Sequence, residues 1–69
     1  MTEEVYIAVS LEADMDQRVA DIAYRGVQWA SLRFEDGEGV LTVYATDDGF
    51  DLPVATALAS IDEAQRRLR

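Results

Sequence analysis

Residues 14–26 of this chain read D-M-D-Q-R-V-A-D-I-A-Y-R-G, and local rules allow two interpretations of them. As a helix, the stretch has a polar N-cap at Asp14 and a C-terminal stop at Gly26. As a strand, residues 19–24 pair with the next segment, and residues 24–26 form a three-residue hairpin loop with Gly26 in the left-handed conformation. The strand is favoured, because Val, Ile and Tyr prefer strands and three aspartates weaken a helix.

The segments on both sides of this stretch have clearer patterns. Residues 4–11 alternate between large apolar and other side chains, which predicts a half-buried strand. Residues 27–46 predict a hairpin whose connection, residues 35–39, contains two glycines that permit positive φ. The side chains expected on one common face are Val5, Ile7, Val9, Leu11, Ala20, Ile22, Ala30, Leu32, Phe34, Leu41, Val43 and Ala45.

A helix is predicted after the acidic turn at residues 47–49. Asp51 is expected to cap it, and Pro53 is expected in its first turn. Arginines near its end suit the negative end of the helix dipole. The apolar residues that recur at helical spacing are Val54, Ala57, Leu58, Ile61 and Leu68.

The predicted fold class is therefore α+β, in a single domain spanning residues 1–69. The favoured architecture is ββββα, a small antiparallel meander with one C-terminal amphipathic helix packed on one face. The alternative is βαββα, in which residues 14–26 form a crossover helix.

The composition argues against an enzyme. The chain has 14 acidic residues and six arginines but no histidine, cysteine or lysine, so its serines lack a histidine or lysine base. Paired carboxylates lack a predicted cleft that would raise one pKa. Residues 47–51 superficially resemble a calcium loop, but they lack its alternating ligands and distal glutamate. We expect no catalytic residue, no cofactor and no metal site.

The formal charge of -8 restricts the partners that the chain can bind. It should repel the phosphates of nucleic acids and anionic membrane surfaces, so neither is expected as a direct partner. The chain also lacks cysteines, a basic N-terminal leader and an apolar run long enough to span a membrane. We therefore expect a cytoplasmic protein with a protein partner or a second copy of itself as a homodimer.

The sheet face opposite the helix is the first candidate binding surface, because nothing obvious in the chain covers it. Its aromatic and arginine side chains are of the types enriched in binding hot spots. Cross-strand pairing of aromatics that merely stabilises the sheet is the alternative. The predicted partner-binding residues are Tyr6, Trp29, Arg33 and Tyr44.

An acidic end of the sheet is the second candidate surface. In both topologies the strands at residues 4–11 and 27–35 point the same way, so the connections after them share one end. Carboxylates there could occupy a basic groove in place of nucleic acid phosphates. They are Glu12, Asp14, Asp16, Glu35, Asp36 and Glu38.

These features favour a non-catalytic interaction protein, for example an inhibitor of the immunity or antitoxin type. The alternatives are an acidic nucleic-acid mimic and a dimeric regulatory domain. Two strands, an acidic turn and an amphipathic helix between Trp29 and Leu68 resemble small antitoxin domains of the HicB type in pattern, with no shared motif.

Overall fold

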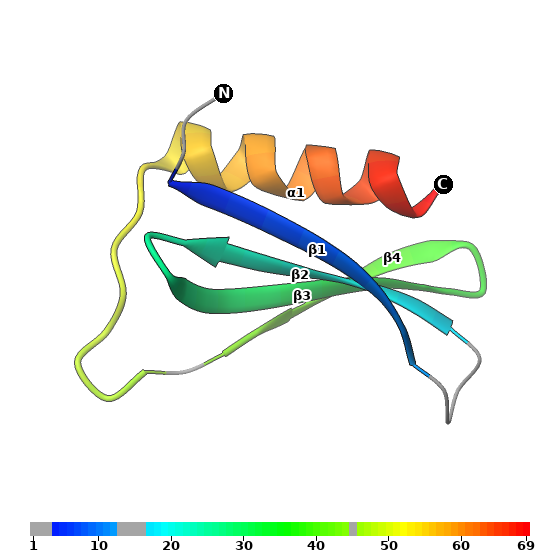
Figure 1. Cartoon of the computed structure of the whole chain (residues 1–69), viewed down its shortest axis with the longest axis horizontal. Coiled ribbons are helices and arrows are strands. Elements are labelled where there is room, and N and C mark those ends of the chain that lie inside the picture. The colour runs from blue at the N-terminus through cyan, green and yellow to red at the C-terminus, as the bar shows by residue number, and fades with distance from the viewer. Residues whose placement is uncertain (1–3, 13–16, 45) are drawn as a thin grey trace.

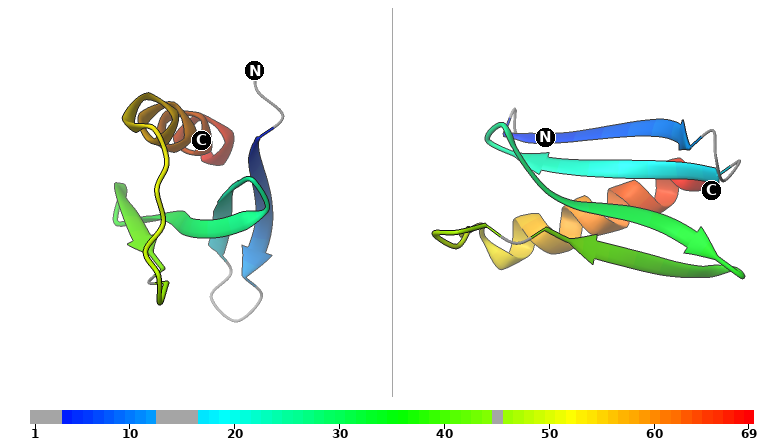
Figure 2. Two further views of the ribbon diagram at one scale, coloured as in Figure 1. Left: turned by 90° about the vertical axis from the view of Figure 1, so that its left-hand side faces the viewer. Right: turned by 90° about the horizontal axis from the view of Figure 1, so that it is seen from below.

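The computed structural model describes residues 4–12, 17–44 and 46–69, and in them the chain forms four strands and one helix (Figure 1). The elements are β1 (Val5–Glu12), β2 (Gln17–Tyr24), β3 (Val27–Glu35), β4 (Glu38–Val43) and α1 (Val54–Leu68). The strands follow the order β1-β2-β3-β4, each antiparallel to its neighbour, and α1 lies across one face of the sheet (Figure 2). The predicted ββββα meander is confirmed, and the βαββα alternative was wrong.

The pairing of β2 explains why its ambiguous sequence forms a strand. Ala20 pairs with Leu32 and Ile22 pairs with Ala30, as the strand interpretation predicted. The side chains of Ala20 and Ile22 have 0% exposure, and Tyr24, the next residue on the same face of β2, is 7% exposed. A period of two places these side chains on one face, whereas a helix would distribute them around its axis.

The turn between β2 and β3 is shorter than the predicted three-residue loop at residues 24–26. Tyr24 pairs directly with Val27, so only Arg25 and Gly26 lie in the turn. Both have positive φ, 52° and 82°. Two successive left-handed residues give the turn type that matches the twist of hairpin strands. The predicted three-residue loop was wrong, because it placed only Gly26 in the left-handed conformation, whereas Arg25 adopts it too.

The turn between β3 and β4 is also tighter than the predicted connection at residues 35–39. It consists of Asp36 and Gly37, with φ of 54° and 82°. Gly39, expected to help form the turn, lies within β4 and pairs with Phe34.

Replacing Gly37 with alanine is expected to destabilise the fold by about 1–2 kcal/mol, because a Cβ is unfavourable in the left-handed conformation. Gly39→Ala is the matched control. Its new Cβ would lie 3.3 Å from Nε2 of Gln65, the movable end of a side chain, and its backbone needs no positive φ. Urea unfolding of both variants measures the difference, and equal losses would contradict this explanation.

The core lies between α1 and the sheet. The helix packs mainly on β2, with further contacts to β1 and β3. The buried apolar residues among those described are Ile7, Ala20, Ile22, Tyr24, Trp29, Ala30, Leu32 and Ala64. Leu11, Leu41 and Val43 were expected under the helix, but they are exposed because one helix is too narrow to cover the whole sheet. Ala45 lies outside the described residues.

The buried stripe of α1 differs from the predicted one. Ala57 and Ile61 pack on the core, together with the fully buried Ala64, whereas Val54 and Leu58 are 74% and 63% exposed. The predicted stripe was too wide, because residues 54 and 58 are rotated toward the β4 side of the helix. Their apolar side chains are left without a covering element in the described part of the chain.

The start of the helix also differs from the prediction. Pro53, expected in the first turn, occupies the N-cap position with extended backbone angles. Asp51 lies two residues further back and does not cap the helix, which has no side-chain cap hydrogen bond. The carbonyl of Pro53 accepts the first helical hydrogen bond, from the Ala57 N–H at 3.0 Å. Arg66 and Arg67 occupy the last turn, as predicted.

Candidate protein-binding surface

The face of the sheet that points away from α1 is called the open face. Its central row crosses all four strands through the paired positions Ala8, Asp21, Ser31 and Thr42. The helix lies on the other side of the sheet, and no described element forms a second layer over this face (Figure 2). The open face is therefore available to a partner.

Trp29, predicted to lie exposed on the open face, is 7% exposed and belongs to the core cluster. The reason is an irregularity in the pairing of β2 with β3. Ile22 pairs with Ala30 but Ala23 pairs with Gln28, which leaves Trp29 as an extra, unpaired residue. Such a bulge interrupts the alternation on which the prediction depended. The expectation that Trp29 is exposed was wrong.

Tyr44 and Arg33 lie on the open face, as predicted, and both are held in place there. The Tyr44 hydroxyl donates to Oγ of Ser31 at 3.1 Å, while Tyr44 remains 41% exposed. Arg33 donates through Nε to Glu35 at 2.7 Å and through Nη1 to Thr42 at 3.0 Å. Such contacts reduce the side-chain entropy that a partner would have to remove on binding.

Tyr6 is the most exposed aromatic side chain among the described residues, at 67%. It lies on β1, far across the sheet from Tyr44, which follows β4. The open face therefore has a tyrosine toward each edge and a polar centre, in place of the predicted continuous aromatic patch. Asp21 lies at that centre, and sequence reasoning missed it. The signal was available, since a strand at residues 19–24 with Ile22 buried places Asp21 on the opposite face.

The predicted acidic end is shared with positive charge. Glu35, Asp36 and Glu38 are exposed around the turn between β3 and β4, and Glu12 ends β1 at the same end of the sheet. Asp14 and Asp16 lie outside the described residues.

The C-terminus of α1 approaches this same end (Figure 1). Its Arg69 guanidinium lies 5.7 Å from the centre of the Phe34 ring, and Arg33 binds Glu35. The strand connections alone, from which this end was predicted to be acidic, contain neither Arg33, which lies within β3, nor Arg69, which follows α1. A purely acidic surface is therefore not present among the described residues of this end.

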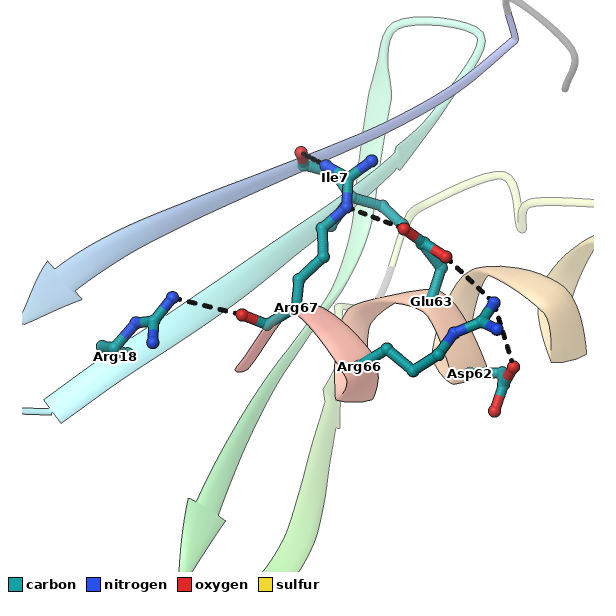
Figure 3. A network of polar contacts seen from close by, with 6 residues as sticks. All are labelled: Ile7, Arg18, Asp62, Glu63, Arg66 and Arg67. Atoms are coloured by element: carbon teal, nitrogen blue, oxygen red, sulfur yellow. Dashed lines mark hydrogen bonds and ion pairs between the residues drawn. The ribbon is translucent and has the colours of Figure 1, made fainter. Parts of the chain in front are cut away.

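An ion-pair network joins the last turns of α1 to β1 (Figure 3). Glu63 accepts from Arg67 and from Arg66, each at 2.9 Å, and Arg66 also pairs with Asp62 at 3.2 Å. Arg67 donates through Nη1 to the carbonyl of Ile7 at 3.0 Å. The hydrogen bond from Arg67 is the main cause that lowers the pKa of Glu63 below its usual value of 4.5.

Stability should therefore depend on pH through Glu63. A carboxyl whose pKa is lower in the folded chain stabilises the fold above its unfolded value of about 4.5, and this contribution is lost as the pH falls through the folded pKa. Glu63→Gln is expected to have a lower Tm than wild type at pH 7. The difference in Tm between the two proteins should become smaller below about pH 4. Thermal unfolding of both proteins between pH 4 and pH 7 measures this difference. A difference in Tm that stays constant with pH would contradict the role of the Glu63–Arg67 pair.

A groove with a volume of about 690 Å³ lies between α1 and the first half of β1. Val5 and Ile7 line it on the strand, and Ala55 and Ala59 line it on the helix. Arg67 lines the groove as well, and its bond to Ile7 ties the helix to the strand there.

The described residues include no group of three or more potential ligands positioned to hold a metal ion. Among them there is also no helix with the length and hydropathy needed to cross a membrane. Comparison with protein-family models, curated proteins and solved structures finds no match to this chain. The likeness to HicB-type antitoxin domains is therefore one of pattern alone.

Proposed function

We propose that this chain is a non-catalytic protein-interaction module that binds a protein partner through the open face. The observation that carries the proposal is an uncovered sheet face on which Tyr6 and Tyr44 are exposed and Arg33 is held by hydrogen bonds. Tyrosine and arginine combine apolar area with hydrogen-bonding groups, and a fixed side chain loses little entropy on binding.

The charge of -8 favours a basic partner, because opposite charge accelerates association and like charge opposes it. An inhibitor of the immunity or antitoxin type, acting in the cytoplasm on a basic protein, fits this size and charge. The nucleic-acid-mimic alternative is weaker than the sequence suggested, because Arg33 and Arg69 lie among the carboxylates of the acidic end. Self-association through the open face is the other alternative.

Tyr44→Ala tests the proposal in a capture experiment with the tagged chain in a cell extract. Tyr44 is partly exposed, so the variant should remain folded, and loss of the captured protein would support binding through the open face. Val54→Ala, an exposed apolar truncation on α1, is the matched control.

Asp36→Lys examines the acidic end in the same assay. Under the proposal it should change capture less than Tyr44→Ala does. If Asp36→Lys abolishes capture and Tyr44→Ala has no effect, the acidic mimic replaces the proposed module. If light scattering shows a dimer that Tyr44→Ala dissociates, the open face serves self-association instead.

A further inference from the structure

The outer edge of β1 presents backbone groups that no strand pairs within the described residues 4–12, 17–44 and 46–69. β1 is an outer strand of the sheet, with β2 on one side only. The N–H of Arg25 donates to the carbonyl of Glu4 at 2.7 Å, so the backbone of Glu4 points toward β2. Antiparallel pairing alternates along a strand, so the N–H and C=O groups of residues 5, 7, 9 and 11 point outward. The bond from Arg67 to the Ile7 carbonyl agrees with this assignment.

This edge lacks the features that commonly prevent strands from pairing. Residues 5–11 contain no charged residue, no proline and no glycine, and β1 extends over eight residues. The other outer strand, β4, is six residues long and contains Glu38 and Gly39. Arg67 occupies only one of the outward carbonyls of β1, and a carbonyl oxygen can accept a second hydrogen bond.

The groove beside this edge has room for side chains. An added strand would place alternate side chains on the helix side of the sheet, where small residues of α1, Ala55 and Ala59, leave the groove open. Its volume of about 690 Å³ is in the range of sites that bind several apolar groups. Edge pairing would supply backbone hydrogen bonds, and the groove would select apolar side chains.

Charge distinguishes the possible occupants. The charged residues that line the groove are Glu63, Arg66 and Arg67. They are bound to one another, and Arg66 also pairs with Asp62 outside the groove, so the four charges of this network cancel. Beyond the uncharged segment, β1 ends at Glu12, and the chain as a whole carries -8. A second copy would bring the same net charge of -8, which opposes association, whereas a basic partner is attracted to the chain as a whole.

We infer that the outer edge of β1 and the adjoining groove bind an extended segment of a basic protein, which adds a fifth strand to the sheet. The segment has alternating apolar residues flanked by lysine or arginine. This inference rests on the proposed function, since it requires a protein partner. It assigns contacts to the β1 edge and the groove, which share Tyr6 with the open face but not Tyr44 or Arg33.

Three synthetic peptides test the inference: KKVTVTVKK, its acidic counterpart EEVTVTVEE and the interrupted peptide KKVTPTVKK. The first should bind at least about tenfold more tightly than the other two, because the second reverses the charge and the third disrupts strand pairing. Amide exchange followed by NMR should show slower exchange at Ile7, Val9 and Leu11 when KKVTVTVKK is bound. Equal binding of KKVTPTVKK, or no change in exchange at these amides, would overturn the inference.

Paired variants locate the site. Ala55→Gln with Ala59→Gln places larger polar groups in the groove and should weaken binding of KKVTVTVKK about tenfold. The control combines Val54→Gln and Leu58→Gln, the residues directly before Ala55 and Ala59. Both are exposed and lie outside the groove, so this pair should have little effect on binding of KKVTVTVKK. Equal weakening by both pairs would contradict the groove.

The free chain and Tyr44→Ala complete the test. A dimer of the free chain with already protected amides at the β1 edge would make a second copy the occupant and overturn the inference. Tyr44→Ala should keep the affinity for KKVTVTVKK. If no peptide binds but capture of a cellular protein still depends on Tyr44, the edge site fails while the proposed function stands.

Discussion

Replacing Trp29 with alanine is expected to lower the free energy of unfolding by about 3–5 kcal/mol. Trp29 is 7% exposed and belongs to the core cluster, so truncation leaves a cavity that a small domain cannot close. The core of a domain this small supplies only about 3–5 kcal/mol in total, so the variant should be largely unfolded at 25 °C. Urea unfolding monitored by circular dichroism measures the loss of free energy of unfolding.

Trp29→Phe is the matched control, because it keeps an aromatic ring but removes the indole N–H. In the described structure Nε1 of Trp29 is buried and has no hydrogen-bond partner, an arrangement that costs about 1–3 kcal/mol. Phenylalanine removes that cost, so its net effect should be much smaller than that of alanine. An alanine variant as stable as wild type would contradict the placement of Trp29 in the core.

The burial of Trp29 also changes which mutation can test partner binding. Trp29→Ala would remove a side chain that the sequence predicts to bind a partner. A variant that unfolds loses every function, so lost binding in Trp29→Ala would not identify an interface. Tyr44 is the better position, because it lies on the open face and is 41% exposed.

Ile22→Ala is expected to lower the free energy of unfolding by about 2–5 kcal/mol. Ile22 is the largest fully buried side chain among the described residues. It pairs with Ile7 on β1 and with Ala30 on β3, so it lies in the middle of the face that α1 covers. Urea unfolding should show the transition at a much lower urea concentration than in wild type, or a chain already largely unfolded without urea.

Val54→Ala controls for the loss of an aliphatic side chain without burial. Val54 is 74% exposed, so its truncation should change the free energy of unfolding by less than about 0.5 kcal/mol. A cost similar to that of Ile22→Ala would mean that the stripe predicted from the sequence, with Val54 in the core, is correct after all.

The sequence alone determined β1, the β3–β4 hairpin and α1, because these depend on local periodicity, and it favoured a strand for β2 without excluding a helix. Alternation at residues 4–11, strand propensity at residues 19–24 and helical spacing after Pro53 each identified an element. The pairing of Ala20 and Ile22 with β3 followed from the same alternation. Two turn lengths were wrong, because the sequence does not show that Arg25 and Asp36 adopt positive φ.

Only the tertiary structure decided which of these side chains form surfaces. Trp29 is an extra residue in the pairing of β3 with β2, and it is buried at this bulge. Strict alternation cannot anticipate such a bulge. The position of α1 over β2 left Leu58 exposed and brought Arg69 to the acidic end. The open face and the β1 edge arise in the same way: periodicity fixes which side chains share a face, but exposure depends on how far one helix reaches across four strands.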